Sequence, residues 1–310
     1  MRFVFFLSFC LSLTLATKAQ TLSQYEKVEI VILGVAQDAG APQIACTKSC
    51  CSSLWTQQKT FWVSCLGLID HGNARQYLFD ATPDIVQQLA FLSQNSGLPM
   101  KQLDGVFITH AHIGHYTGLM HLGREAMGAK EVPVYSMPRM ASFLRTNGPW
   151  SQLVDLKNIS IHEMEDKQSI QLSDSLVIIP MLVPHRGEFS ETVGFRIIGP
   201  RKSALFIPDI DKWEKWEKSI VEEIKKVDYA FIDATFFRNG EIKGRDMSTI
   251  PHPFVEESMR IFEPLSGADK NKIHFIHFNH TNPLLFDDEA IQFVREKGYN
   301  LSVRGMRFDL

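Results

Sequence analysis

Three histidines fall within six positions directly after a short apolar run of the chain. The run covers residues 103–108, and the histidines are His110, His112 and His115. Neutral imidazole is the commonest side-chain metal ligand, and two histidines one residue apart at a strand end direct both rings to the same side. His115 follows in a turn or helix from which it can reach that side. This stretch therefore predicts a metal site.

Other histidines and aspartates also follow strand-like runs. Candidate strands cover residues 76–79, 175–184, 203–208, 229–232 and 272–276, and they end at Asp80, His185, Asp209, Asp233 and His277 respectively. Loops at strand ends are where a rigid scaffold usually places its chemistry. We expect one shared site with the metal ligands His110, His112, His115, His185, Asp209 and His277.

These ligands suit hydrolysis through a metal-activated water. Imidazole and carboxylate do not discriminate sharply between metals, so Zn(II) is expected first, as one or two ions, with Fe(II) or Mn(II) as alternatives. Asp209 is expected to hold the ion and orient the nucleophile, and His280 to donate a proton or serve as a ligand. Asp233 is expected to orient a ligand or cap its strand. His252, which stands between two prolines, is expected to be structural or to line the pocket.

Three cysteines are closely spaced as Cys46, Cys50 and Cys51. The spacing is compatible with a structural zinc site whose fourth ligand comes from elsewhere in the chain. It is equally compatible with a disulfide, if the protein reaches an oxidising compartment, and with free thiols. The spacing alone leaves all three states open.

The first 19 residues have the pattern of a secretory signal. Arg2 precedes an apolar run over residues 3–15, and small residues lead up to Ala19. The run is shorter than the ~20 residues that span a bilayer, although a retained anchor is the alternative reading. We expect cleavage near Ala19, export to the periplasm or the medium, and a single domain over residues 20–310.

Composition and charge restrict the partners. The chain has 310 residues, of which 45% are hydrophobic, and a formal net charge of -3. Such a composition suits an ordinary globular core. Without a basic stripe, nucleic acid is not expected as a partner, and no later segment is apolar enough to span a membrane. A small-molecule substrate is expected, while the oligomeric state is not indicated.

The order of strands and helices predicts an α/β (α+β) protein. Two short apolar runs, 65–69 and 76–79, are too close together for a crossover helix, so they predict a hairpin and a mixed sheet. We expect two mixed sheets that face each other, with helices outside. Helices are expected over residues 116–126 and 212–226, the second of them amphipathic and packed through its tryptophans.

The chain resembles the metallo-β-lactamase fold superfamily in the order of these residues. The His-x-His-x-Asp-His motif of the superfamily is similar to residues 110–115, and its later histidine, bridging aspartate and last histidine are similar to His185, Asp209 and His277. The resemblance covers about residues 28–310 and implies an αββα sandwich. It also implies that Asp80 supports the histidine loop without binding metal.

A closer resemblance is to the pyrroloquinoline quinone biosynthesis protein B (PqqB) group of that superfamily. It is carried by residues 40–43, 81–85, 231–237 and, above all, 277–285. The group's Cys-x-Cys-x-x-Cys spacing differs from the cysteine spacing here, and the group is cytoplasmic. This resemblance implies an Fe(II)-dependent oxygenase as the alternative to a hydrolase. A non-catalytic protein that binds metal or a small molecule is the third hypothesis.

Gly114 departs from the superfamily motif. The motif has at this position an aspartate that helps to hold a second metal, and glycine offers no ligand atom. One ion and a water need only the remaining ligands His110, His112, His185 and Asp209, and this arrangement is favoured. A second site would bind weakly or would need another group, such as Asp38 or His280.

Overall fold

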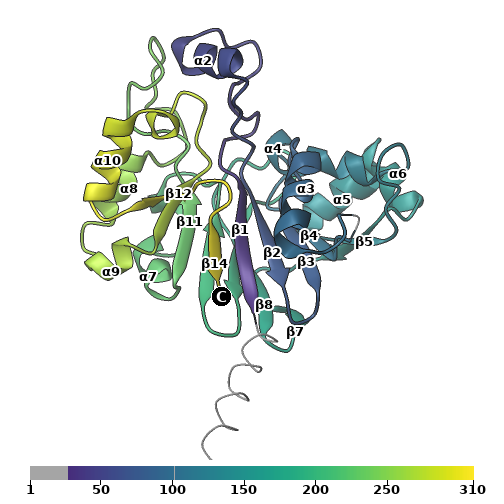
Figure 1. Ribbon diagram of the computed structural model, residues 1–310. Coiled ribbons are helices and arrows are strands. Elements are labelled where there is room, and N and C mark those ends of the chain that lie inside the picture. Colours follow the sequence, from purple (N-terminus) through teal and green to yellow (C-terminus); the bar gives the residue numbers. More distant parts are fainter. Residues whose placement is uncertain (1–26, 101) are drawn as a thin grey trace, which may run out of the picture.

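Two seven-stranded sheets form the body of the protein (Figure 1). The computed structural model describes residues 27–100 and 102–310, so the expected signal sequence over residues 1–19 lies outside the described residues. The first sheet has the order β14-β1-β2-β3-β4-β5-β6, with strands β14 (Arg307–Asp309), β1 (Val28–Gly34), β2 (Cys65–Asp70), β3 (Arg75–Phe79), β4 (Gly105–Phe107), β5 (Val132–Ser136) and β6 (Ile159–Glu163). The second has the order β13-β12-β11-β10-β9-β8-β7, with strands β13 (Asn300–Leu301), β12 (Ile273–Ile276), β11 (Tyr229–Asp233), β10 (Ser203–Ile207), β9 (Val193–Ile198), β8 (Leu176–Leu182) and β7 (Ile170–Ser173).

Both sheets are mixed. In the first, β14, β1, β2 and β3 pair antiparallel, and β3 to β6 pair parallel. In the second, β7 to β10 pair antiparallel and β10 to β13 parallel. The hairpin expected over residues 65–79 is present as β2 and β3. The expected class, two mixed sheets with helices outside, is confirmed.

Helices cover the outer sides of the sheets (Figure 1). On the side of the first sheet lie α3 (Ile85–Ser96), α5 (Pro138–Thr146) and α6 (Trp150–Asp155), and on the side of the second lie α7 (Ile220–Lys225), α8 (Val255–Ile261), α9 (Gly267–Lys270) and α10 (Asp288–Glu296). The remaining elements are α2 (Ser49–Gln57), which stands at one end of the molecule, α4 (Ile113–Tyr116), and the 3-10 helices η1 (Thr117–Leu122), η2 (Trp213–Lys215) and η3 (Pro283–Leu285).

Aromatic rings join the two sheets beneath the strand ends that carry the candidate ligands. Phe79 of β3 stacks on Phe107 of β4 with ring centroids 5.0 Å apart, and it meets Phe195 of β9 edge-on at 5.3 Å. All three rings are fully buried. Such pairs add to the burial of apolar area. Phe79 and Phe107 of this buried aromatic cluster directly precede Asp80 and the histidine loop.

The prediction of a helix over residues 116–126 is wrong. The chain instead makes the single turn α4 and then the 3-10 helix η1. The helical segment ends at Leu122, because Gly123 is extended with φ -65° and ψ 170°. Gly118 allows close packing, since a Cβ atom there would lie 2.1 Å from the carbonyl oxygen of Thr82. The segment is packed against the backbone that precedes α3.

The prediction of one helix over residues 212–226 is also wrong, because this segment is divided into η2 and α7. Ser219 caps α7 by accepting a hydrogen bond from the backbone N–H of Glu222, which starts a new helix there. Trp213 and Trp216 are buried as expected, although not on one helix. Their indole N–H groups donate to Ser258 and to the carbonyl of Leu182.

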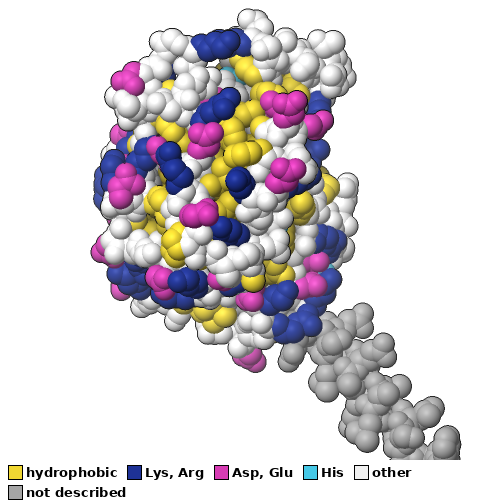
Figure 2. Space-filling view, turned by 90° about the vertical axis from the view of Figure 1, so that its left-hand side faces the viewer, with side chains coloured by type: hydrophobic (Ala, Val, Ile, Leu, Met, Phe, Trp, Pro, Cys, Tyr) yellow, Lys and Arg dark blue, Asp and Glu magenta, His cyan; other side chains and the backbone are white. Residues whose placement is uncertain are grey.

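The surface carries charges of both signs. On the face over α7 to α10, basic and acidic side chains alternate with small apolar areas (Figure 2). This agrees with the absence of a basic stripe from the sequence. Among residues 27–100 and 102–310, no helix has the length and hydropathy required to cross a membrane.

Candidate metal centre

Two clusters of ligand atoms lie at the ends of the strands. We call His110, His112, His185 and Asp209 the first ligand group, and Asp38, His115 and His277 the second ligand group. Within each group, one ligand atom of every residue lies within 4.8 Å of the others. The rings of His110 and His115 have centroids 4.2 Å apart, so the two groups are neighbours. The structure thus brings together all six metal ligands expected from the sequence and divides them between two positions.

The first ligand group draws on three loops. His110 and His112 follow β4, His185 follows β8, and Asp209 follows β10. The Oδ2 atom of Asp209 lies 3.3 Å from Nε2 of both His110 and His185. His112 Nδ1 lies 2.8 Å from His110 Nε2. Three nitrogens and a carboxylate oxygen that converge in this way are a donor set that suits zinc with an open position for water.

The second ligand group contains polar atoms without partners. His115 and His277 are completely buried, and the Oδ1 atom of Asp38 lies 3.4 Å from His115 Nε2. The atoms Asp38 Oδ1, His115 Nε2, His277 Nε2 and Asp209 Oδ1 are buried and make no hydrogen bond among the described residues. Buried polar atoms normally have partners. Since these are the atoms that would face an ion, the residues present fit a metal.

Asp80 supports the histidine loop from behind. Its carboxylate accepts hydrogen bonds from Nδ1 of His115 at 2.7 Å and from the backbone N–H and hydroxyl of Thr109 at 2.8 and 2.9 Å. The Thr109 hydroxyl lies 3.0 Å from Nδ1 of His110. Hydrogen bonds to Nδ1 fix the ring orientation and direct Nε2 toward the metal. Asp80 therefore lies where the family resemblance placed it.

Asp233 has the corresponding position in the second sheet. Its Oδ1 atom accepts hydrogen bonds from the backbone N–H and hydroxyl of Thr235 at 2.8 and 2.7 Å. The Thr235 hydroxyl in turn accepts one from Nδ1 of His277 at 2.9 Å. Asp233 is thus connected to a ligand of the second group through Thr235, and its role in orienting that ligand stays a prediction.

His252, expected to be structural or to line the pocket, lies beside the carboxylates of the centre. Its Nδ1 atom lies 3.2 Å from Asp209 Oδ1 and 2.9 Å from Asp233 Oδ2, so it links a candidate ligand to a supporting carboxylate. No apolar run precedes His252, and so the strand-end pattern could not find it. The flanking Pro251 and Pro253 were the only signal, and they left a structural role and a place in the pocket lining both open.

Burial sets the protonation of the histidines. It lowers the pKa of His110, His185 and His277, which are therefore neutral and have a lone pair to offer. Burial raises the pKa of Asp209, but the nearby imidazoles, chiefly His252 and His185, outweigh it and hold this pKa well below its usual range. Asp209 is thus an anionic carboxylate beside the neutral imidazoles of His110 and His185, the protonation state that a cation requires.

His115 differs because two carboxylates flank it. Burial acts to lower its pKa, but Asp80 and Asp38 together raise it to about 10. The pKa of Asp38 is lowered in return, since the interaction with His115 outweighs its own burial. In the protein without an ion, a proton on His115 Nε2 partly offsets the two negative charges. A bound cation would displace this proton.

His280 lies with the three cysteines. A ligand atom of His280 is within 4.8 Å of the sulfurs of Cys46, Cys50 and Cys51, and the sulfurs of Cys46 and Cys50 are 3.8 Å apart, which excludes a bond between them in this structure. His280 Nδ1 donates to Asn279 Oδ1 at 2.7 Å, which leaves Nε2 free. The proton-donor role expected of His280 stays a prediction.

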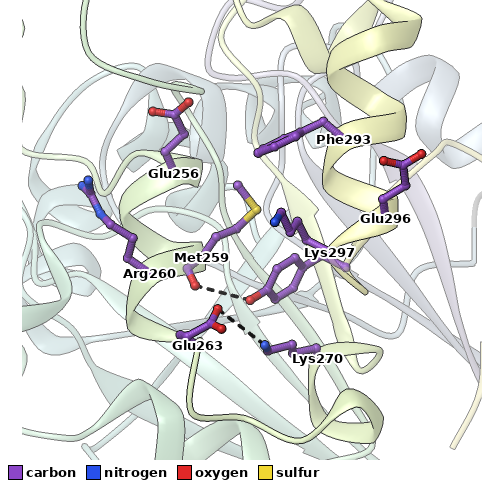
Figure 3. Close-up of a pocket in the computed structure, with 9 residues that line it drawn as sticks. Glu256, Met259, Arg260, Glu263, Lys270, Phe293, Glu296 and Lys297 are labelled. Carbon is purple, nitrogen blue, oxygen red and sulfur yellow. Dashed lines mark hydrogen bonds and ion pairs between the residues drawn. The ribbon is translucent and has the colours of Figure 1, made fainter.

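A hollow of about 540 Å³ opens beside the first ligand group, where His185, Pro184, Arg139, Lys167, Lys215 and Trp216 are among its lining residues. Another, of about 660 Å³, lies between α8 and α10 (Figure 3). The latter is lined by Met259, Phe293, Tyr299 and charged side chains, and none of the candidate ligands reaches it. The hollow at His185 is therefore the one that adjoins the metal centre.

Comparison with known families gives one match over most of the chain. Residues 75–278 match the family described as the beta-lactamase superfamily domain. This segment contains the strand-end residues from Asp80 to His277, with every residue of the first ligand group. Asp38 precedes the segment.

The individual proteins that match this chain do so at low sequence identity. The chain is 24% identical to coenzyme PQQ synthesis protein B of Methylorubrum extorquens (strain PA1) over 308 residues, which cover 91% of this chain and all of that protein. The crystal structure of Zn(2+)-bound PqqB from Methylobacterium extorquens aligns with a TM-score of 0.75 at 20% identity, over 91% of this chain and all of that one. A diphosphatase from the PhnP family aligns with a TM-score of 0.64 at 21% identity, over 92% and 97% of the two chains. At these identities the solved structures establish the fold.

Proposed function

Because the chain belongs to the beta-lactamase superfamily and has a PqqB-like metallo-β-lactamase fold, we propose that it is a metal-dependent hydrolase that acts on a small molecule. The observation that carries the proposal is the first ligand group, in which three imidazoles and the carboxylate of Asp209 converge beside an open hollow. No other cluster among the described residues adjoins that hollow through a lining residue.

The residues of the centre have distinct roles in this proposal. When bound, a divalent ion lowers the pKa of coordinated water toward ~7, which makes hydroxide available at neutral pH. His110, His112 and His185 would hold the ion through their imidazole nitrogens. Asp209 would add an anionic oxygen through Oδ2, with His252 Nδ1 3.2 Å from its Oδ1, and its carboxylate would orient the nucleophile.

Zinc is the metal we propose. The donor set of imidazoles and one carboxylate is common to catalytic zinc sites, and a similarly folded PqqB has been solved with Zn(2+) bound. Fe(II) and Mn(II) accept the same ligands. Elemental analysis of protein purified from its native compartment identifies the ion directly.

The test of the function combines metal content with turnover. His112→Ala should lose metal from the centre and lose hydrolysis of chromogenic ester, lactam and phosphodiester substrates together. His162→Ala is the matched control, because His162 is an exposed histidine of β6 outside every ligand group. Full activity of a metal-free His112→Ala protein would end the proposal.

An Fe(II)-dependent oxygenase is the competing activity, implied by the resemblance to the PqqB group. The two activities differ in what they consume. Oxygen uptake with Fe(II) but not with Zn(II) would favour the oxygenase. Tight metal binding without turnover of either kind would favour a binding protein.

We also propose a structural zinc held by Cys46, Cys50, Cys51 and His280. Support comes from the fourth ligand, which the sequence left unassigned and which the fold supplies from the loop after β12. The site would tie α2 to the end of the second sheet. Burial, aided by the neighbouring sulfurs, raises the pKa of Cys50 to about 12, so zinc binding would release protons.

Export remains part of the proposal. Support comes from Arg2, the apolar run over residues 3–15 and the small residues before Ala19. Amino-terminal sequencing of the protein recovered from periplasm and medium tests it. A mature chain that begins near residue 20 is expected, and an intact Met1 in the cytoplasm would contradict export.

A further inference from the structure

Gly114 and Asp38 occupy complementary positions. A Cβ atom built on Gly114 would lie 2.4 Å from Asp38 Cα and 2.6 Å from Asp38 Oδ1. Separations below 3.0 Å are essentially never seen for real Cβ atoms. Any side chain at position 114 would therefore displace Asp38. Gly114 offers no ligand atom to the histidine motif, and its lack of a side chain leaves the space that Asp38 occupies beside His115.

The loop that carries Asp38 is fixed to the strand end that carries His277. The backbone N–H of Gln37 donates to the carbonyl of Phe278, and the N–H of Phe278 donates to the carbonyl of Val35, both at 2.8 Å. Asp38 itself has a φ of 23°, in the left-handed region that non-glycine residues rarely adopt. The fold thus holds Asp38 against the second ligand group at a cost in backbone strain.

The carboxylate of Asp38 points at the two histidines of the second ligand group, His115 and His277. Its Oδ1 atom is 3.4 Å from His115 Nε2, and Oδ1, His115 Nε2 and His277 Nε2 are all buried without a hydrogen bond. Asp209 is not in this group: its Oδ2 atom belongs to the first ligand group, and its Oδ1 atom lies 3.2 Å from His252 Nδ1. Buried ligand atoms of Asp38, His115 and His277 that lie within 4.8 Å of one another, without a hydrogen bond, are the arrangement expected around an ion.

We infer that Asp38 supplies, from the loop after β1, the carboxylate that the superfamily motif takes from position 114, and that Asp38, His115 and His277 hold a second divalent ion. The inference rests on the proposed function, since this ion adjoins the one held by the first ligand group. It replaces the single-ion arrangement favoured by the sequence, because the missing ligand is present from another part of the chain.

Metal stoichiometry tests the inference without reference to activity. The full-length protein is saturated with Zn(II), freed of loose metal by gel filtration, and analysed by elemental analysis beside its variants. Asp38→Asn keeps the shape of the side chain and should bind one equivalent less than the parent. Asp174→Asn, a change of an exposed aspartate, should bind as much as the parent. Unchanged metal content in Asp38→Asn would overturn the inference.

A swapped variant tests whether the two positions are equivalent. The double change Asp38→Gly with Gly114→Asp moves the carboxylate to the motif position and removes the residue with which it would collide. It should recover the equivalent that Asp38→Asn loses, whereas Gly114→Asp alone should not bind the parent's full amount. A swapped variant that stays one equivalent short would overturn the equivalence of the two positions.

His112→Ala separates failure of the inference from failure of the proposed function. If His112→Ala loses metal and Asp38→Asn does not, the centre exists and Asp38 is not its ligand. If His112→Ala binds as much metal as the parent, the proposed centre itself is wrong.

Discussion

His115 donates a hydrogen bond from Nδ1 to Asp80 at 2.7 Å, at a point where a strand of the first sheet ends. The second sheet repeats this arrangement through Asp233 and Thr235, whose hydroxyl accepts from Nδ1 of His277 at 2.9 Å. Each sheet therefore ends in an aspartate that orients one histidine of the second ligand group. The two halves of the sandwich contribute equivalent supports to a centre that lies between them.

Substitution of Asp80 should weaken metal binding without removing a ligand. Asp80→Asn leaves an amide beside His115 Nδ1, so the ring loses the carboxylate that orients it. Loss of such supporting groups typically reduces metal affinity about 10–100-fold. Competition with a chelating dye measures the affinity. Asp104→Asn, at the opposite end of β4, is the control, and equal affinities in the two variants would contradict the role given to Asp80.

His252 should act as a positioning residue for Asp209. His252→Ala removes the ring that contacts Asp209 and Asp233, and we expect a loss of about 10–100-fold in metal affinity, with kcat reduced more than KM changes. The amide nitrogen of His252→Asn can take the place of Nδ1, whereas that of His252→Gln cannot. Partial rescue by Asn and none by Gln is expected from a dye-competition titration. Equal losses in all three variants would indicate a packing role only.

The cysteine site should contribute stability through zinc. Cys50→Ser should lose one zinc equivalent and unfold at a lower temperature, because a structural ion contributes its binding free energy to the folded state. Elemental analysis and thermal denaturation measure the two effects. Cys65→Ala is the control, since Cys65 is a buried thiol outside the cluster. Retention of all zinc by Cys50→Ser would exclude the site.

Acid should destabilise the protein through His274. Burial lowers the pKa of His274 to about 4, so between its unfolded value of about 6.5 and 4 the unfolded chain binds the extra proton. The stability due to the neutral ring is complete above pH 6.5 and is lost as the pH falls toward 4, by about 3 kcal/mol at most.

His274→Leu isolates this effect. His274 packs against Phe231 and Phe308 and lies outside the ligand groups, so leucine can fill its place. Urea unfolding of both proteins with chelator present should show a smaller loss of unfolding free energy from pH 7 to pH 4.5 in the variant. Identical pH dependence would contradict a depressed pKa for His274.

The sequence predicted the ligands through a local rule. Apolar runs ending in histidine or aspartate identified Asp80, His185, Asp209, Asp233 and His277, because a strand and the residue after it are adjacent in the chain. Reasoning from helix periodicity failed for residues 116–126 and 212–226. The first helical segment ends before the extended Gly123, and in the second a new helix begins after the Ser219 cap. Local patterns do not report such breaks.

Sequence alone thus determined the family resemblance, the two mixed sheets and the identities of six candidate ligands. Tertiary structure decided how they are grouped. It set Asp38 in the space left open at Gly114, His252 between two carboxylates, and His280 among the cysteines. These partners are 19 to 234 residues apart in the chain, and loops bring them together only after both sheets have packed. The spacing of residues along the chain does not show which of them the packed sheets bring together.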